Sequence, residues 1–103
     1  MSYMFSGCKS LKYLNLSNLN ASKVTDMSYM FNDCIELESL DLSNFYTPSL
    51  QHMTFMFSEC QSLKYINLQN LNTSKVETMK RVFYNCKSLK SLNLSSFNTS
   101  KVY

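Results

Sequence analysis

The feature that most constrains this chain is a phrase of sulfur-bearing and aromatic residues that returns every 26 residues. The phrase MSYMF begins at Met1 and again at Met27, and the related phrases MTFMF and MKRVF begin at Met53 and Met79. Cut at these methionines, the chain divides without a gap into four units: 1–26, 27–52, 53–78 and 79–103. A period of this length is typical of arrays in which each unit packs on its neighbours. The sequence therefore predicts one continuous array over its whole length.

Each unit contains two patterns of apolar residues, which predict different secondary structures. In Leu14-Asn15-Leu16 apolar and polar residues alternate, as is typical of a half-buried strand. Another set of apolar residues follows at spacings of 3, 3, 1 and 3: Val24, Met27, Met30, Phe31 and Cys34. This spacing predicts one face of a short helix.

Polar triplets between these segments predict turns and helix starts. In Asn72-Thr73-Ser74, Ser74 would form a capping box with Glu77. The dipeptide Thr47-Pro48 favours the earlier position instead, because Pro suits the first residue of a helix. The N-cap is therefore predicted at either Thr73 or Ser74. The asparagines that open the triplets are expected to bond turn backbone groups: Asn20, Asn72 and Asn98.

Taken together, the two patterns predict an α/β solenoid. Equivalent strands of the four units would form a parallel β-sheet on one face, and short helices would cover the other. The residues that stand at the positions of Leu14 and Leu16 in each unit, here called the columns of Leu14 and Leu16, would point into the core between the layers. The chain ends in Met1-Ser2-Tyr3 and Lys101-Val102-Tyr103 rather than in polar capping units, so we expect an excerpt of a longer array.

One stretch carries a family resemblance. Leu11-Lys12-Tyr13-Leu14-Asn15-Leu16 has the leucine-rich-repeat signature L-x-x-L-x-L. The fuller phrase NTSKVETMKRVFYNCKSLKSLNLSSFNTSKV, with its Met-Phe-Cys and Asn-Thr-Ser elements, resembles the BspA-type leucine-rich-repeat surface proteins. The resemblance covers the whole chain, although Tyr46-Thr47-Pro48-Ser49 departs from the pattern. It implies a surface protein of a bacterium or protist that is linked to adhesion.

The four cysteines, at positions 8, 34, 60 and 86, fall in one column of the repeat. Neighbouring units would bring their Cα atoms within disulfide range, but the side chains would point in parallel into the core. A metal site would need close pairs such as C-x-x-C, which the sequence lacks. We expect a ladder of buried free thiols, with disulfides and a metal as the alternatives.

Nothing in the sequence predicts catalysis or a cofactor. His52 is the only histidine, and its spacing implies no partner acid or nucleophile. Gly7 is the only glycine, so a phosphate-binding glycine loop is absent. A net charge of +3, without a recognition motif, predicts no nucleic-acid partner. No run of about 18 apolar residues is present, so no transmembrane segment is predicted in this stretch.

The predicted ligand-binding face consists of the x positions of L-x-x-L-x-L, which project outward from the strands. These positions are Lys12, Tyr13, Asn15, Glu38, Ser39, Asp41, Lys64, Tyr65, Asn67, Lys90, Ser91 and Asn93. Tyr13 and Tyr65 would wall a shallow slot, with Ser39 between them and Asp41 beside it, for a peptide or a glycan. The alternative is that these tyrosines merely cover the sheet.

The functional prediction is a non-catalytic recognition or adhesion module. The resemblance implies a cell-surface or secreted protein with a protein or glycan ligand on the sheet face and adjoining repeats of the same chain beside it. The alternative is an intracellular protein–protein interaction scaffold, which reduced cysteines suit better because oxidising compartments favour disulfides.

Overall fold

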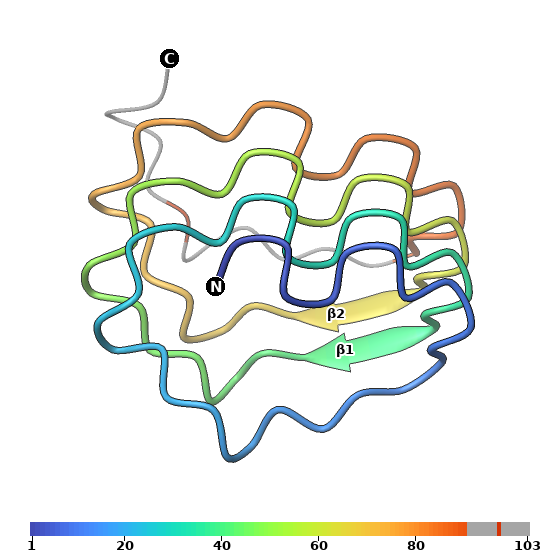
Figure 1. Ribbon diagram of the computed structural model, residues 1–103, viewed down its shortest axis with the longest axis horizontal. Coiled ribbons are helices and arrows are strands. Elements are labelled where there is room, and N and C mark those ends of the chain that lie inside the picture. The colour runs from blue at the N-terminus through green and yellow to red at the C-terminus, as the bar shows by residue number, and fades with distance from the viewer. Residues whose placement is uncertain (91–96, 98–103) are drawn as a thin grey trace.

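The computed structural model describes residues 1–90 and Phe97, and its chain winds into stacked coils, one coil for each unit (Figure 1). Two strands are present in the described part, β1 (Ser39–Asp41) and β2 (Tyr65–Asn67). They pair in parallel, with Ser39 opposite Tyr65 and Asp41 opposite Asn67. Each residue of β1 thus pairs with the residue one repeat length later in the chain, so the repeat length sets the pairing. The parallel direction expected from the sequence is confirmed, but the prediction of a strand in every unit is not: residues 14–16 of the first unit form no strand, and 91–96 of the fourth lie outside the described residues.

The prediction of helices, and with it the α/β solenoid, is wrong. Residues 1–90 and Phe97 contain no helix. The segment expected to form one runs instead as successive turns, with φ of 59° at Tyr29 and 64° at Asp33. A right-handed helix needs φ near about −63° at every residue. The left-handed residues stand at two fixed positions of every unit: Tyr3, Gly7, Tyr29, Asp33, Phe55, Glu59, Arg81 and Asn85.

Backbone hydrogen bonds explain why turns replace the helix. Within the second coil, the N–H of Met30 donates to the carbonyl of Met27 at 3.2 Å. The N–H of Tyr29, one residue earlier, donates instead to the carbonyl of Thr54 in the next coil at 2.9 Å. An α-helix would bond every N–H within itself, whereas here alternate N–H groups join neighbouring coils. Successive turns bring apolar residues spaced 3, 3, 1 and 3 apart to one side of the chain, as a helix would. The spacing of these residues therefore did not distinguish turns from a helix.

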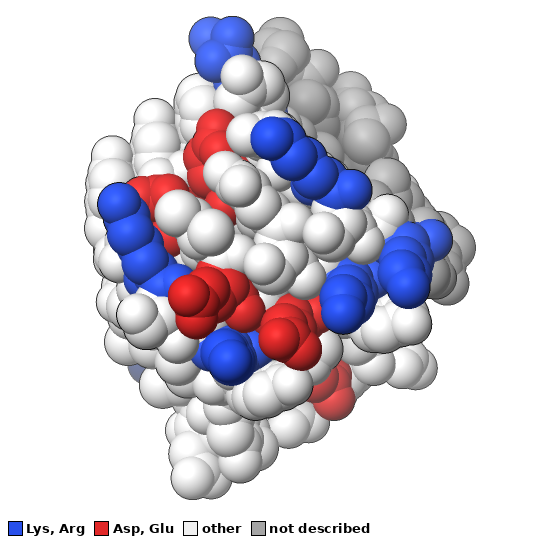
Figure 2. All heavy atoms as spheres, turned by 90° about the vertical axis from the view of Figure 1, so that its right-hand side faces the viewer, with Lys and Arg blue, Asp and Glu red and all other residues white. Residues whose placement is uncertain are grey.

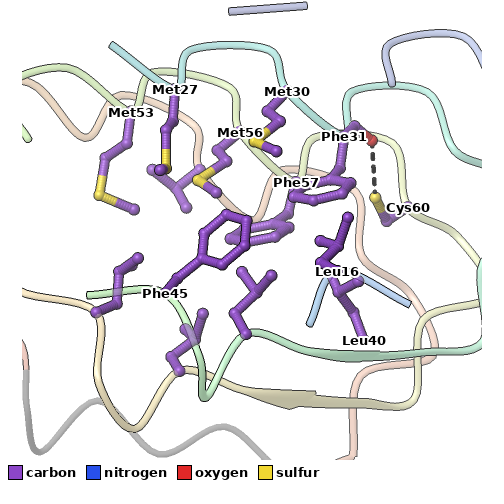
Figure 3. Close-up of a cluster of buried hydrophobic side chains, with 14 of the residues drawn as sticks. Leu16, Met27, Met30, Phe31, Leu40, Phe45, Met53, Met56, Phe57 and Cys60 are labelled. Carbon is purple, nitrogen blue, oxygen red and sulfur yellow. Dashed lines mark hydrogen bonds between the residues drawn. The ribbon is translucent and has the colours of Figure 1, made fainter. Parts of the chain in front are cut away.

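Each coil has a turn side, which begins at Met1, Met27, Met53 or Met79, and a strand side, which includes β1 and β2. The core lies between these two sides (Figure 3). Met30 and Phe31 enter it from the turns, and Leu40 enters from β1; all three are buried. In the column of Leu16, Leu42 and Leu68 are buried, as expected. Among the described residues at the position of Leu14, Leu40 is buried, whereas Leu14 and Ile66 are partly exposed. Leu92 and Leu94 lie outside the described residues, so the inward orientation is confirmed for the three described residues at the position of Leu16 and in part at the position of Leu14.

The cysteines form a ladder of free thiols. The Sγ of Cys60 donates to the carbonyl of Phe31 at 3.2 Å, and the Sγ of Cys34 donates likewise to Phe5 at 3.1 Å (Figure 3). Cys34 and Cys60 are buried, and burial raises the pKa of the Cys34 thiol to about 11 and that of Cys60 further. The thiols are therefore protonated and unreactive at neutral pH.

Asparagine side chains close the turns at the opposite edge. The Oδ1 of Asn20 accepts the N–H of Ser22 at 2.9 Å, and that of Asn72 accepts the N–H of Ser74 at 2.9 Å. This confirms the role expected for both asparagines, while Asn98 lies outside the described residues. Because no helix begins here, neither Thr73 nor Ser74 is an N-cap.

The second unit departs from this pattern, as its sequence suggested. Its Thr47 hydroxyl accepts the N–H of Asn72 at 2.8 Å and donates to the carbonyl of Asn72 at 3.1 Å. Tyr46 stands in the asparagine column of this unit and is exposed. The asparagines at this position in the first and third units bond their own turns, whereas the Thr47 hydroxyl bonds the next coil, so the two contacts are separate features.

Candidate functional site

An open pocket of about 290 Å³ lies over the paired strands. Its lining consists of the two strands themselves: Ser39, Leu40, Asp41, Tyr65, Ile66 and Asn67. Side chains alternate along a strand, so the polar residues at the ends of each strand project outward while Leu40 faces the core. The register brings Ser39 beside Tyr65 and Asp41 beside Asn67. The strands therefore gather a hydroxyl, a carboxylate, an amide and an aromatic ring over a small area.

The carboxylate and the amide of the pocket are held by local backbone contacts. The Oδ1 of Asp41 accepts the N–H of Ser43 at 2.8 Å, and the Oδ1 of Asn67 accepts the N–H of Gln69 at 3.0 Å. Asn15 makes the same contact with Ser17 at 2.9 Å in the first coil. Hydrogen bonds from Ser43 lower the pKa of Asp41 below its ordinary value, so its carboxyl is ionised at neutral pH. These contacts orient both head groups before any ligand arrives.

Tyr13 and Tyr65, the two predicted walls, lie in different surroundings. Tyr65 lines the pocket, and its side chain is 55% exposed. Tyr13 is 64% exposed and is absent from the lining. Its hydroxyl donates to Oε2 of Glu38 at 3.0 Å, and this hydrogen bond is the main reason that the pKa of Tyr13 is raised. The structure therefore brings Tyr65, Ser39 and Asp41 together as expected, but it engages Tyr13 with Glu38.

The charged residues of the predicted face follow one another on successive coils. The N–H of Glu38 donates to the carbonyl of Lys12 at 3.0 Å, and the N–H of Lys64 donates to the carbonyl of Glu38 at 2.8 Å. Lys90 continues this column with a bond of 3.1 Å to Lys64. Ser91 and Asn93, the remaining predicted residues of the face, lie outside the described residues.

The edge where the coils lead into the strands carries interspersed positive and negative side chains (Figure 2). Within residues 1–90 and Phe97, the one ion pair joins Lys9 to Asp33 at 3.7 Å. Both groups are substantially exposed, and such a pair contributes only about 0–1 kcal/mol. This ion pair therefore adds little to the stability of the stack.

Sequence reasoning missed an aromatic column on the turn side. The Tyr3 ring stacks on Tyr29 with centroids 4.7 Å apart, and Tyr29 stacks on Phe55 at 4.9 Å. The Arg81 guanidinium lies 5.9 Å from the Phe55 ring and 5.1 Å from that of Tyr84. The signal was present in the third position of each unit, which reads Tyr, Tyr, Phe and Arg. Interpreting the segment as a helix concealed that these side chains would stack.

His52 has neighbours that were not anticipated either. Parallel bridges join Asp26 to His52 and His52 to Thr78, so the three residues follow one another on successive coils. Nδ1 of His52 lies 3.5 Å from Oγ1 of Thr78, which accepts a hydrogen bond from Thr54 at 3.0 Å. Burial acts to raise the pKa of Asp26, but hydrogen bonds from Ser28 and Ser2, together with the nearby His52, lower that pKa overall. Asp26, His52 and Thr78 are one repeat length apart in the sequence, so the repeat alone would have predicted that they lie side by side.

The described residues also bear on metals and membranes. Over residues 1–90 and Phe97, no group of three histidine, cysteine or acidic side chains is arranged to hold a metal ion. The same part of the chain has no helix long and apolar enough to cross a membrane.

Comparisons with known proteins give one match. No curated protein and no solved structure matches the chain. A family profile described as Mycoplasma protein of unknown function, DUF285, matches residues 1–103. Since the match spans every one of the four units, the chain belongs to the DUF285 family.

Proposed function

We propose that this protein is a non-catalytic recognition module that binds a peptide or a glycan over β1 and β2. The observation that carries the proposal is the pocket lined by Tyr65, Asp41, Asn67 and Ser39. The resemblance to BspA-type surface proteins supports a cell-surface or secreted setting and a role in adhesion.

The chemistry of the pocket suits recognition. A tyrosine ring offers a rigid apolar surface and a hydroxyl, and such residues often dominate binding energy. Asp41 and Asn67 supply acceptors, and Asn67 also supplies an amide donor. Because local contacts already fix the head groups of Asp41 and Asn67, little side-chain freedom remains to be lost on binding.

His52 is explained by contacts between coils. Its Nδ1 lies 3.5 Å from Oγ1 of Thr78 on the next coil. The Thr78 hydroxyl also accepts a hydrogen bond from Thr54. The arrangement is accounted for as a polar contact between coils.

An array experiment tests the proposal. The labelled chain is applied to glycan and peptide arrays, beside Tyr65→Ala, Asp41→Ala and the matched control Tyr46→Ala. Tyr46 is equally exposed but lies outside the pocket. We expect a ligand that the chain and the control bind and that both pocket variants bind at least about tenfold more weakly, as one lost anchor of 1.4 kcal/mol implies. Binding that survives both pocket substitutions, or an array without a selective ligand, contradicts the proposal.

Tyr13 gives a second test of the same face. With a ligand from the arrays, Tyr13→Ala should weaken binding less than Tyr65→Ala, because Tyr13 lies outside the pocket lining. Isothermal titration calorimetry would measure both affinities, and circular dichroism would check folding. Unchanged affinity in the double variant, with an intact thermal midpoint, would assign the ligand to another surface.

One observation favours a second candidate, an intracellular interaction scaffold. All four cysteines are free, although the coils stack them in one column. Free thiols are usual in reducing compartments. Protease treatment of intact cells that produce an epitope-tagged protein distinguishes the two settings. Loss of the tag supports the surface proposal, and protection supports the scaffold.

A further inference from the structure

The negative charge in the pocket is not explained by the turn that its carboxylate closes. Oδ1 of Asp41 accepts the N–H of Ser43 at 2.8 Å. Asn15 and Asn67 stand at the same position of the first and third units, and each accepts the N–H two residues later, at 2.9 and 3.0 Å. A neutral amide oxygen therefore serves this turn in two other units. The contact with Ser43 accounts for an oxygen at position 41 but not for its charge.

The charge of Asp41 is also not neutralised by a cation of the described part of the chain. The one ion pair there joins Lys9 to Asp33. Asp41 is the only charged residue in the three equivalent stretches of the first three units, which are 13–18, 39–44 and 65–70. The equivalent stretch of the fourth unit, 91–96, contains no charged residue in its sequence. Because Asp41 is exposed, its charge is presented to a ligand that enters the pocket.

The aromatic ring of the pocket is open to a ligand as well. The Tyr65 side chain is mostly exposed, and none of the ring stacks or cation contacts among the described residues involves it. Ser39 stands at the same position of the second unit, so a strand forms there without a large ring. The face of an aromatic ring carries partial negative charge and attracts cations. The two features of the pocket that the fold does not require therefore favour the same kind of ligand.

The register of the strands sets the distance between the ring and the carboxylate. Tyr65 lies opposite Ser39, and Asp41 follows two residues after Ser39 in the same strand. From the spacing of strands and residues in a sheet, Tyr65 and Asp41 are diagonal neighbours about 8 Å apart. One ammonium or guanidinium group fits between two side chains at this separation. Just before the strands, Glu38 and Lys64 are opposite in sign, so the net attraction for a cation comes from Asp41.

We propose that the pocket binds the cationic side chain of an arginine or a lysine in a peptide, between Tyr65 and Asp41. The inference rests on the proposed function and narrows its ligand. The guanidinium or ammonium group donates to the carboxylate of Asp41 and lies against the ring of Tyr65. A long side chain suits an open pocket, because its methylene stem covers apolar surface while its head stays polar. An amino sugar carries the same charge without such a stem, and it enters the test as the competing source of a cation.

Peptides that differ only in charge test the proposal. The labelled chain is applied to an array of octapeptides of varied neutral sequence, beside glucosamine oligosaccharides. Each peptide is made with arginine, lysine, citrulline, acetyl-lysine or glutamate at its centre. We expect the arginine and lysine versions to bind at least about tenfold more tightly than their neutral counterparts, as the loss of one hydrogen bond between charged groups implies. Added salt should weaken the binding of the cationic versions, because the pocket is open to solvent.

Asp41→Asn removes the charge and keeps the turn. Since Asn15 and Asn67 close the same turn, this variant should fold, and circular dichroism with a thermal scan checks that it does. We expect Asp41→Asn to lose the preference for arginine over citrulline and Asp41→Glu to retain part of it. Glu77→Gln removes the same charge from an exposed residue outside the pocket lining and should leave the preference unchanged. Equal losses in Asp41→Asn and Glu77→Gln overturn the proposal, because the preference would then follow the net charge of the chain.

The outcomes separate this inference from the proposed function. A ligand that needs Tyr65 and Asp41 but binds equally well with arginine or citrulline overturns the cationic ligand and leaves the recognition site in place. Capture of the glucosamine oligosaccharides in preference to the cationic peptides overturns the peptide in the same way. An array on which nothing binds through Tyr65 and Asp41 contradicts both the inference and the proposed function.

Discussion

The inner units and the outer units repeat nearly the same sequence but differ in burial. Phe31 and Phe57, in the second and third units, are fully buried, whereas Phe5 and Phe83 are only partly covered. Cys34 and Cys60 are buried, and their counterparts at positions 8 and 86 are partly exposed. Equivalent residues thus differ because an inner coil has a neighbour on each side and an outer coil has one. Stability in such a stack resides mainly in the contacts between coils rather than within them.

The largest effect should come from removing a ring of the phenyl ladder. Phe57→Ala should lower the free energy of unfolding by about 3–5 kcal/mol, because it leaves a cavity that both neighbouring coils line. Phe5→Ala should lower it by only about 1–2 kcal/mol, since part of that ring is in solvent. Chemical denaturation followed by circular dichroism measures both. Equal losses would show that the difference in burial has no energetic consequence.

A smaller effect is expected where the turns demand a left-handed residue. The first unit has Gly7 with φ of 75° at this position, and the second has Asp33 with φ of 64°. No atom lies within 4 Å of a Cβ added at Gly7, so Gly7→Ala meets no clash. The backbone alone should cost about 1–2 kcal/mol of stability. Ser10→Ala, on the exposed surface of the same unit, serves as the control in the denaturation experiment. A neutral Gly7→Ala would mean that the outer coil relaxes to another turn.

This left-handed position also shows where the sequence was insufficient. The alternation of Leu40 and Asp41, and of Ile66 and Asn67, predicted outward and inward faces and parallel pairing, because a strand pattern is local and the repeat sets the register. The spacing of Met27, Met30, Phe31 and Cys34 suits a helix equally well as turns. Hydrogen bonds to the next coil, such as that from Tyr29 to Thr54, make the difference between a helix and turns. The helix propensity of single residues contains no information on such contacts.

The candidate site was likewise predictable in part. Ser39, Asp41, Tyr65 and Asn67 were expected on one face, and they line the pocket. The hydrogen bond of Tyr13 to Glu38 depends on side-chain rotamers, which spacing along the chain does not fix. The aromatic column from Tyr3 to Phe55 was overlooked because it required the turns to be known first.

The inner thiols should make stability depend on pH at the alkaline end. The Cys34 thiol has a pKa of about 11 when folded, against an ordinary value of 9.0, because burial disfavours the thiolate. The unfolded chain therefore loses this proton first, and the contribution of Cys34 to stability is complete below pH 9.0 and declines towards pH about 11. Denaturation of the chain and of Cys34→Ala as a function of pH measures this, and the variant should show a shallower decline. Parallel curves would contradict it.

Thiol alkylation resolves the same contrast between inner and outer units. Since the thiolate is the reactive form, Cys34 and Cys60 should label more slowly than the partly exposed Cys8 and Cys86. Mass spectrometry of the labelled peptides gives the order, and fast labelling of native Cys60 or a disulfide-linked peptide would contradict the buried ladder.

The smallest effect should come from the surface contact that joins the first coil to the second. Tyr13→Phe removes the hydroxyl that donates to Glu38 at 3.0 Å, and the side chain is mostly in solvent, so the free energy of unfolding should stay nearly unchanged. Glu38→Gln should change stability as little, but it should lower the pKa of Tyr13 towards its ordinary value, because the hydrogen bond and charge of Glu38 are what raise it. Denaturation measures the first quantity, and NMR of labelled tyrosine measures the second. A loss of stability as large as that of Phe5→Ala would mean that surface contacts, and not the apolar core, hold the outer coil.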